Sequence, residues 1–114
     1  MGTSNTILTE TDPTGKSATE SGAKLDSGKN RIDLIFNGMP LALKAIAEVA
    51  TFGANKYSED GWQHVPDGIK RYTAAMDRHR LETGKDPDSG LLHDAHLAWN
   101  ALARLELKLR KNEN

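Results

Sequence analysis

The first clear pattern of apolar positions begins at Pro40 and follows helical spacing. Proline suits the first position of a helix. Gly53 and Asn55 are both residues that stop helices, so the predicted helix ends at one of them. The apolar positions between these signals recur every three or four residues and are Leu41, Ala45, Val49 and Phe52. A polar loop at residues 56–62 follows this predicted helix.

Two further amphipathic patterns follow. Asp67 can cap a second helix, whose apolar face is formed by Ile69, Tyr72, Ala75 and Met76. Asp88 or Ser89 can cap a third, long helix that runs to about Arg110, and Leu105 lies at the edge of its apolar face. The other residues of that face are Leu91, Ala95, Trp99, Leu102 and Leu109. Because no alternating strand pattern appears, the sequence predicts an all-α fold, a small bundle with three main helices.

The N-terminal residues differ in composition from the predicted helices. Residues 1–28 are rich in Thr, Ser, Gly, Asp and Glu, which is typical of a flexible leader or of an arm that orders against a partner. Residues 22–31 differ, because three cations and two glycines lie close together there. This composition suits an anion-binding loop, but charge runs are usually solvated linkers, which the spacing alone favours. We place the leader at residues 1–21 and the all-α domain at residues 22–114.

Size and composition limit the possible classes of protein. The 114 residues allow one domain, and an apolar fraction of 37% with 5% aromatics predicts a thin core that is completed by oligomerisation. The absence of cysteine excludes disulfides, cysteine-ligated metals and a cysteine nucleophile. A net charge of −1 gives no general attraction to a nucleic-acid polymer or a membrane. With no apolar run of about 20 residues and no signal peptide, the expected location is cytoplasmic.

Polar residues interrupt the predicted apolar faces. Glu48 lies at the border of the first face, where a carboxylate either reaches solvent or is paired or bound to a metal. His79 lies toward the core side of the second helix, a position typical of a hydrogen-bonded core histidine and open to a ligand. Asp86 and Asp88 precede the third helix and can cap it or bind a divalent cation, although capping suits Asp88 better.

The third predicted helix carries the most informative polar stripe. His93, His96 and Asn100 project within about 60° of one another. Two histidines one turn apart can share a metal or a phosphate, or they can face another helix with their imidazoles hydrogen-bonded. Asp94 projects about 100° away from His93, so the adjacent pair does not indicate a joint role. No phosphate-binding P-loop, dinucleotide glycine fingerprint or nucleophile elbow is present.

The order of several segments resembles a known family. The segments are GAKLDSGKNR at residues 22–31, GANKY at 53–57 with Trp62, Arg71-Tyr72 with Arg78-His79, DPDSGL at 86–91 and HDAHLAWNAL at 93–102. This series resembles the small phage-encoded dATP/dGTP diphosphohydrolase family, which is grouped with the all-α nucleoside triphosphate pyrophosphohydrolases of the MazG type. The resemblance covers residues 22–107. It implies metal-dependent hydrolysis of purine deoxynucleoside triphosphates to the monophosphate and pyrophosphate, in the host cytoplasm if the protein is phage-encoded.

The resemblance also implies roles for particular residues. One or two Mg²⁺ ions would clamp the phosphates and activate a water, and an imidazole-rich site would also suit Mn²⁺, Co²⁺ or Zn²⁺. Glu48 and His79 are the candidate catalytic residues, and the candidate metal ligands are Glu48, Asp86, His93 and His96, with His79 a further possible ligand. The cations that would neutralise the triphosphate are Lys24, Lys29, Arg31, Lys56 and Arg78. Asn100 would position a phosphate or read the base edge, and Trp62 would stack on the base.

One departure from the MazG type keeps other functions open. The Glu-x-x-Glu and Glu-x-x-Asp ligand motifs are absent, because Thr51 stands where a partner of Glu48 is expected. The two-metal carboxylate cluster is therefore not carried over to this chain. A nucleotide-binding protein without turnover is an alternative that this absence favours. His93-Asp94 suggests an HD-type phosphohydrolase, and a structural helical adaptor is a third alternative.

Overall fold

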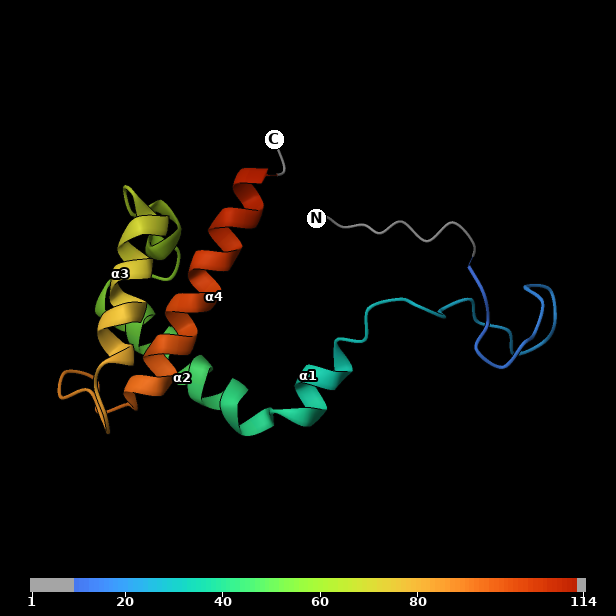
Figure 1. The fold of residues 1–114 in the computed structure, drawn as a ribbon, viewed down its shortest axis with the longest axis horizontal. Helices are drawn as coiled ribbons and strands as arrows, with labels where there is room; N and C mark the ends of the chain where they lie inside the picture. The colour runs from blue at the N-terminus through green and yellow to red at the C-terminus, as the bar shows by residue number, and fades with distance from the viewer. Residues whose placement is uncertain (1–9, 113–114) are drawn as a thin grey trace. The chain divides into compact units, whose positions relative to one another are not determined.

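A computed structural model describes residues 10–112, which form helices, turns and loops without a β-strand (Figure 1). The elements in chain order are α1 (Asp33–Gly38), α2 (Pro40–Lys56), the 3-10 helix η1 (Gly61–His64), α3 (Gly68–Arg80) and α4 (His93–Asn112). The predicted all-α class and the three main helices are confirmed. No helix within the described residues is both long enough and apolar enough to cross a membrane.

The chain divides into two units, Met1–Ile35 and Phe36–Asn114. In the first unit, Asp12 is 9% exposed and its carboxylate organises the turns around it. The carboxylate accepts hydrogen bonds from the backbone amides of Thr14, at 2.6 Å, and Lys24, at 2.7 Å, and from the Thr14 hydroxyl. Of the predicted leader, residues 1–9 lie outside the described residues, and residues 10–21 form turns.

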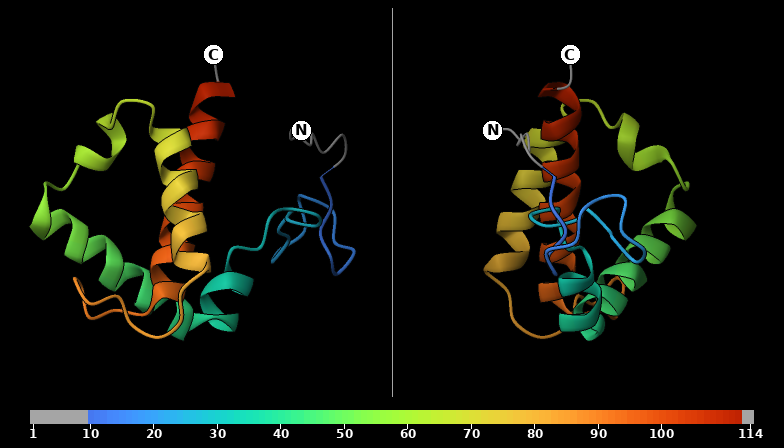
Figure 2. Two further views of the ribbon diagram at one scale, coloured as in Figure 1. Left: turned by 60° about the vertical axis from the view of Figure 1, so that its left-hand side comes forward. Right: turned by 90° about the vertical axis from the view of Figure 1, so that its right-hand side faces the viewer.

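In the second unit, α3 and α4 lie side by side, and α2 contacts α4 (Figures 1 and 2). A side chain at Gly68, the first residue of α3, would place its Cβ 3.1 Å from Leu107 of α4, so glycine permits this close approach. α2 diverges from the α3–α4 pair toward its C-terminal end, and η1 lies on the connection that returns to α3 (Figure 2).

The core of this unit is thin, as the composition predicts. The buried apolar residues are Val49, Ala95 and Ala103, and the buried polar residues are His93, His96 and Asn100. The predicted apolar face of the last helix is only partly covered within this unit. Leu102, Leu105 and Leu109 are about half exposed, at 49%, 51% and 53%.

Several predicted helix ends differ from those observed. α2 begins at Pro40 as predicted but continues through Gly53 and Asn55 to Lys56. Asp67 occupies the N-cap position of α3, but its side chain makes no capping hydrogen bond. The last helix starts at His93. Asp88 and Ser89 belong to the preceding loop and do not cap this helix. Helices α1 and η1 were not predicted.

The turns around Asp12 provide a test at low pH. The hydrogen bond from the Thr14 hydroxyl, followed by that from the Lys24 amide, lowers the pKa of Asp12 from 3.8 to about 2. Because the folded pKa is the lower one, the carboxylate stabilises the turns fully above pH 3.8, and we expect that contribution to disappear as the pH falls through about 2. Titration of the Asp12 carboxyl carbon by NMR, with hydrogen exchange of the Lys24 amide, measures both events. A midpoint at the ordinary value would contradict this expectation.

Candidate functional site

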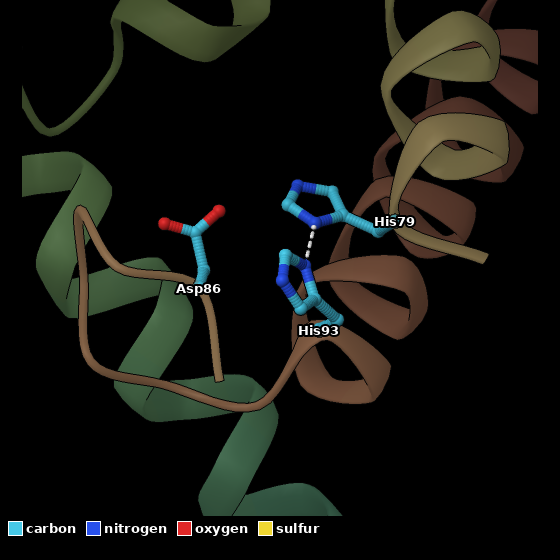
Figure 3. Close-up of side chains that lie close together, drawn as sticks. All are labelled: His79, Asp86 and His93. Carbon is cyan, nitrogen blue, oxygen red and sulfur yellow. Dashed lines mark hydrogen bonds between the residues drawn. The ribbon is translucent and has the colours of Figure 1, made fainter. Parts of the chain in front are cut away.

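Three imidazoles meet where the end of α3 faces the start of α4. Nδ1 of His79 lies 2.9 Å from Nδ1 of His93, so one of the two nitrogens donates a hydrogen bond to the other (Figure 3). The ring of His79 stacks on that of His96, with centroids 4.7 Å apart and planes 12° apart. Phe52 of α2 contacts the His96 ring edge-on, at 6.3 Å between centroids. Contacts from three helices therefore fix the rings.

Burial keeps two of these imidazoles uncharged. It lowers the pKa of His79, and the neighbouring His96 and His93 lower it further. Burial likewise lowers the pKa of His96 below its ordinary value of 6.5. At neutral pH both side chains are therefore in the form that binds a metal ion or accepts a proton.

The carboxylate of Asp86 completes a possible metal site. One ligand atom each from His79, Asp86 and His93 lie within 4.8 Å of one another, the one such group among the described residues (Figure 3). Burial acts to raise the pKa of Asp86, but hydrogen bonds from the amides of Asp88 and Ser89 outweigh it and lower that pKa. Two imidazoles and a carboxylate suit a divalent first-row ion such as Mn²⁺, Co²⁺ or Zn²⁺.

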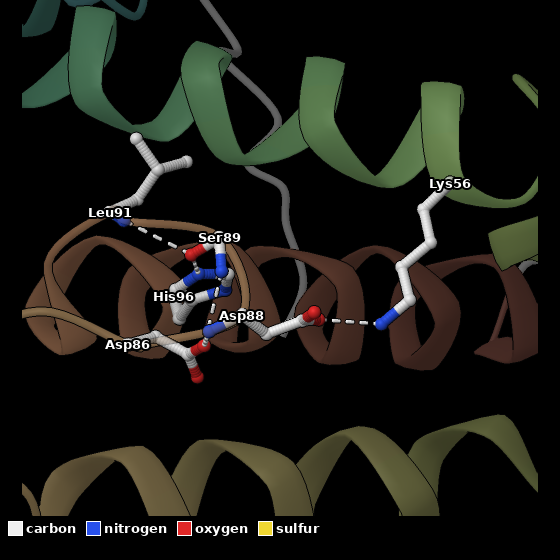
Figure 4. Close-up of polar contacts among 6 residues, drawn as sticks. All are labelled: Lys56, Asp86, Asp88, Ser89, Leu91 and His96. Carbon is white, nitrogen blue, oxygen red and sulfur yellow. Dashed lines mark hydrogen bonds and ion pairs between the residues drawn. The ribbon is translucent and has the colours of Figure 1, made fainter.

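The loop at residues 81–92 carries Asp86 to the imidazoles. Gly84 and Gly90 have φ of 75° in the left-handed region, which strongly favours glycine. The Asp86 amide donates to the Leu91 carbonyl at 2.8 Å, and the Gly90 amide donates to the Asp86 carbonyl at 2.7 Å. The Asp86 carboxylate also accepts a hydrogen bond, from the Asp88 amide at 2.8 Å (Figure 4). Both the backbone and the side chain of Asp86 therefore hold the loop in shape.

Two further contacts join this loop to the helices (Figure 4). The hydroxyl of Ser89 accepts from the Leu91 amide at 3.1 Å and lies 2.6 Å from Nε2 of His96. Nζ of Lys56, the last residue of α2, forms an ion pair with Asp88 at 2.6 Å. The loop is thus fastened to α4 on one side and to α2 on the other.

A cavity of about 850 Å³ extends from the imidazoles between α2, η1, α3 and α4. His79, His96 and Asp86 line its polar end, and the cations along its walls are Lys56, Arg71 and Arg78. The aromatic side chains that line it are Phe52, Tyr57, Trp62, Tyr72 and Trp99. A space that combines cations, aromatic rings and a possible metal site has the chemistry needed for a nucleotide and its phosphates.

The aromatic rings form a connected group. The centroid of Trp99 lies 5.9 Å from that of Trp62 and 5.6 Å from that of Tyr72, with edge-to-face geometry. The Tyr72 hydroxyl donates to the Trp62 carbonyl at 2.6 Å. The guanidinium of Arg110 lies 5.5 Å from the Trp62 ring. Trp62 is therefore packed into this group while it also lines the cavity.

The structure brings most of the predicted site residues to one place. Asp86, His79 and His93 form the ligand group, and His96 stacks on it. The predicted substrate-binding residues that line the cavity are Lys56, Trp62, Arg78 and Asn100.

Four other predicted residues are not part of this group. Glu48 is exposed on α2, where Val49 and Phe52 line the cavity instead. Lys24, Lys29 and Arg31 belong to the first unit. There Lys29 pairs with Glu10, and Arg31 pairs with Asp33, each at 2.9 Å. The residue after His93, Asp94, is exposed, in line with its predicted direction.

Sequence reasoning missed two residues of the site. Ser89 was considered only as a helix cap, yet its hydroxyl contacts His96. Arg71 lines the cavity together with Arg78, and their separation of seven residues, or two helical turns, could have signalled a shared face.

Comparison with known proteins identifies one family. A model of the family described as "dATP/dGTP diphosphohydrolase, N-terminal" matches residues 19–114. No curated protein and no solved structure matches the chain.

The ligand group provides a test that needs no nucleotide. We expect the protein to bind Mn²⁺ or Zn²⁺, and we expect His79→Ala or Asp86→Ala to weaken binding at least about tenfold, because each removes a ligand. Since the pKa of His79 is lowered, protonation of this ligand should weaken metal binding only at a lower pH than for a histidine with the ordinary pKa. Calorimetric titration measures this, with the exposed His64→Ala as the matched control. Equal affinities in all variants would rule out the assigned ligands.

Proposed function

The chain belongs to the dATP/dGTP diphosphohydrolase N-terminal family, and on that premise we propose that it hydrolyses dATP or dGTP to the monophosphate and pyrophosphate. The family name points to diphosphohydrolase activity in general. The observation that carries the proposal is one cavity that is lined by two members of the ligand group, His79 and Asp86, together with cations and aromatic rings.

Two arginines support binding of the phosphates. Arg71 and Arg78 line the cavity from α3, and neither forms an ion pair with another described residue. Lys56 is held at the rim by Asp88. Because a triphosphate carries several negative charges, guanidinium groups that have no carboxylate partner would bind and orient it. The aromatic group around Tyr72 would receive the base.

The ligand group supports the chemistry of hydrolysis. A divalent ion held by His79, Asp86 and His93 would supply positive charge for the phosphates and acidify a water. His96, which is outside the ligand group and whose pKa is lowered by burial, is able to accept the proton of a water that attacks the α-phosphorus. The bond from the α-phosphorus to the bridging oxygen then breaks, and pyrophosphate leaves. Mg²⁺, Mn²⁺ or Co²⁺ would fill this role.

Binding without turnover is a second candidate function, favoured by a specific observation. The ligand group contains one carboxylate, Asp86, whereas the MazG-type motifs supply several. A protein that holds an intact nucleotide in the same cavity would need the cations and aromatic rings but no water activation. Calorimetry with dGTP, followed by recovery of the unchanged nucleotide, would distinguish this function from hydrolysis.

The proposed reaction is tested by following both products. With Mn²⁺ or Mg²⁺, we expect ³¹P NMR to show pyrophosphate and a monophosphate formed from dGTP or dATP. We expect His79→Ala to lower kcat/KM by about 100-fold or more, because a metal ligand is lost. Asp94→Asn is the control, since Asp94 is exposed and not among the ligand group. Loss of activity in Asp94→Asn with His79→Ala active would favour the HD-type alternative.

We also propose that a second copy of the chain covers the apolar stripe of α4. Leu102, Leu105 and Leu109 are each about half exposed and project within about 60° of one another. Only three small apolar residues are buried in the described part of the chain, so a single copy gains little from its own core. A symmetric contact between two stripes would bury the leucines of both copies.

The stripe is tested by a charge placed at its centre. We expect Leu105→Glu to convert a dimer into a monomer, because the carboxylate would lose its solvent in the contact. Light scattering after size-exclusion chromatography measures the mass. Lys111→Glu is the control, since it adds the same side chain about 120° round the helix. A wild-type protein that is monomeric at all concentrations would contradict the proposal.

A further inference from the structure

Asn100 combines burial with an unused hydrogen-bond acceptor. It lies on α4, is 6% exposed and lines the cavity. Its Nδ2 donates to the carbonyl of His96 at 2.8 Å. This bond fixes the orientation of the amide, since Oδ1 in that place would face another oxygen. Oδ1 has no hydrogen-bond partner among the described residues, although a buried acceptor normally has one.

The register of α3 and α4 places Asn100 between the two ends of the cavity. The stacked rings of His79 and His96 mark one level of the helix pair, and the bond from Arg104 to Thr73, at 2.7 Å, marks another. Asn100 lies one turn from His96, about 6 Å along α4, and thus between these levels. The aromatic group begins at Tyr72, two turns from His79 on α3.

The facing part of α3 leaves room at this middle level. Ala74 and Ala75 line the cavity there, between Tyr72 and Arg78. Small side chains opposite a buried amide leave space for a ring the size of a pentose. In a nucleoside triphosphate the sugar connects the phosphates to the base. If the phosphates lie at the imidazole end and the base at the aromatic end, as the proposed function has it, the sugar lies beside Asn100.

The chemistry of Oδ1 restricts what it can bind. Phosphate oxygens are acceptors, so an amide oxygen gives them no hydrogen bond. A deoxyribose presents one hydroxyl donor, at its 3′ position. We propose that Oδ1 of Asn100 accepts a hydrogen bond from the 3′-hydroxyl of a nucleotide bound in the cavity. Asn100 then recognises the sugar, rather than a phosphate or the base edge; this inference rests on the proposed function.

The contact is tested with nucleotides that differ only in the hydroxyl. The probes are the α,β-methylene analogues of dGTP and of 2′,3′-dideoxy-GTP, which cannot be cleaved at the α–β bridge, and the adenine pair. Calorimetry with Mn²⁺ present gives the ratio of their dissociation constants. We expect the wild-type protein to bind the 3′-hydroxyl analogue about 3- to 10-fold more tightly, the usual effect of one neutral hydrogen bond.

Variants at Asn100 should remove this preference. We expect the ratio to fall to about one in Asn100→Leu, which keeps the size of the side chain and removes the acceptor. Asn100→Ala gives the same test if the leucine variant does not fold. Asn112→Leu, at the exposed end of the same helix, is the matched control and should keep the wild-type ratio. Because each protein is measured with both nucleotides, a change in its stability does not affect the ratio.

Each other outcome overturns the proposal. A wild-type ratio of about one, or a preference that persists in both Asn100 variants, would rule out the sugar contact while leaving the proposed function intact. A loss of affinity for Mn²⁺ alone in Asn100→Leu would make Asn100 a metal ligand instead. Failure of the wild-type protein to bind any of the four nucleotides would reject the proposed function together with this inference.

Discussion

The packing of α3 against α4 depends on hydrogen-bond partners for the polar groups that the contact buries. Imidazoles and an amide occupy the positions on α4 where a larger domain would place leucine. Each polar group buried without a partner would cost about 1–3 kcal/mol. The structure meets most of this demand locally, through the His79–His93 bond, the bond from Asn100 Nδ2 to its own helix, and a bond from Arg104 to Thr73. Two of these residues, His79 and Asn100, also line the cavity.

The helical part of the fold could be predicted because it depends on local pattern. Pro40 and the spacing of apolar residues place α2 and the other long helices without any knowledge of tertiary contacts. The ends were harder to place, because capping residues also bond to loops. Asp86 and Ser89 satisfy amides within the loop at residues 81–92, so the last helix begins only at His93. The leucines of α4 follow the same helical period as its core residues. The period alone therefore does not show which apolar residues are buried in the core and which form a second, exposed face of the helix.

The site was predictable in its residue types but not in its grouping. His93 and His96 share a helix, so their proximity follows from the sequence, whereas their meeting with His79 and Asp86 depends on how two helices and a loop pack. Glu48 fits the expected chemistry but lies one position away from the lining residue Val49. A shift of one residue turns a helical side chain by about 100°. The basic segment at residues 22–31 has the expected cations, yet Lys29 and Arg31 are already paired with carboxylates of their own unit.

The hydrogen bonds within the loop at residues 81–92 affect more than its shape. Backbone bonds, two left-handed glycines and the Ser89 hydroxyl close the loop on itself and on α4. The conformational entropy lost in ordering Asp86 is therefore lost when the chain folds, and a ligand that later meets this carboxylate finds it preorganised. A side chain at Gly84 or Gly90 would strain the left-handed backbone of the loop, and the Asp86 carboxylate would then be less well preorganised.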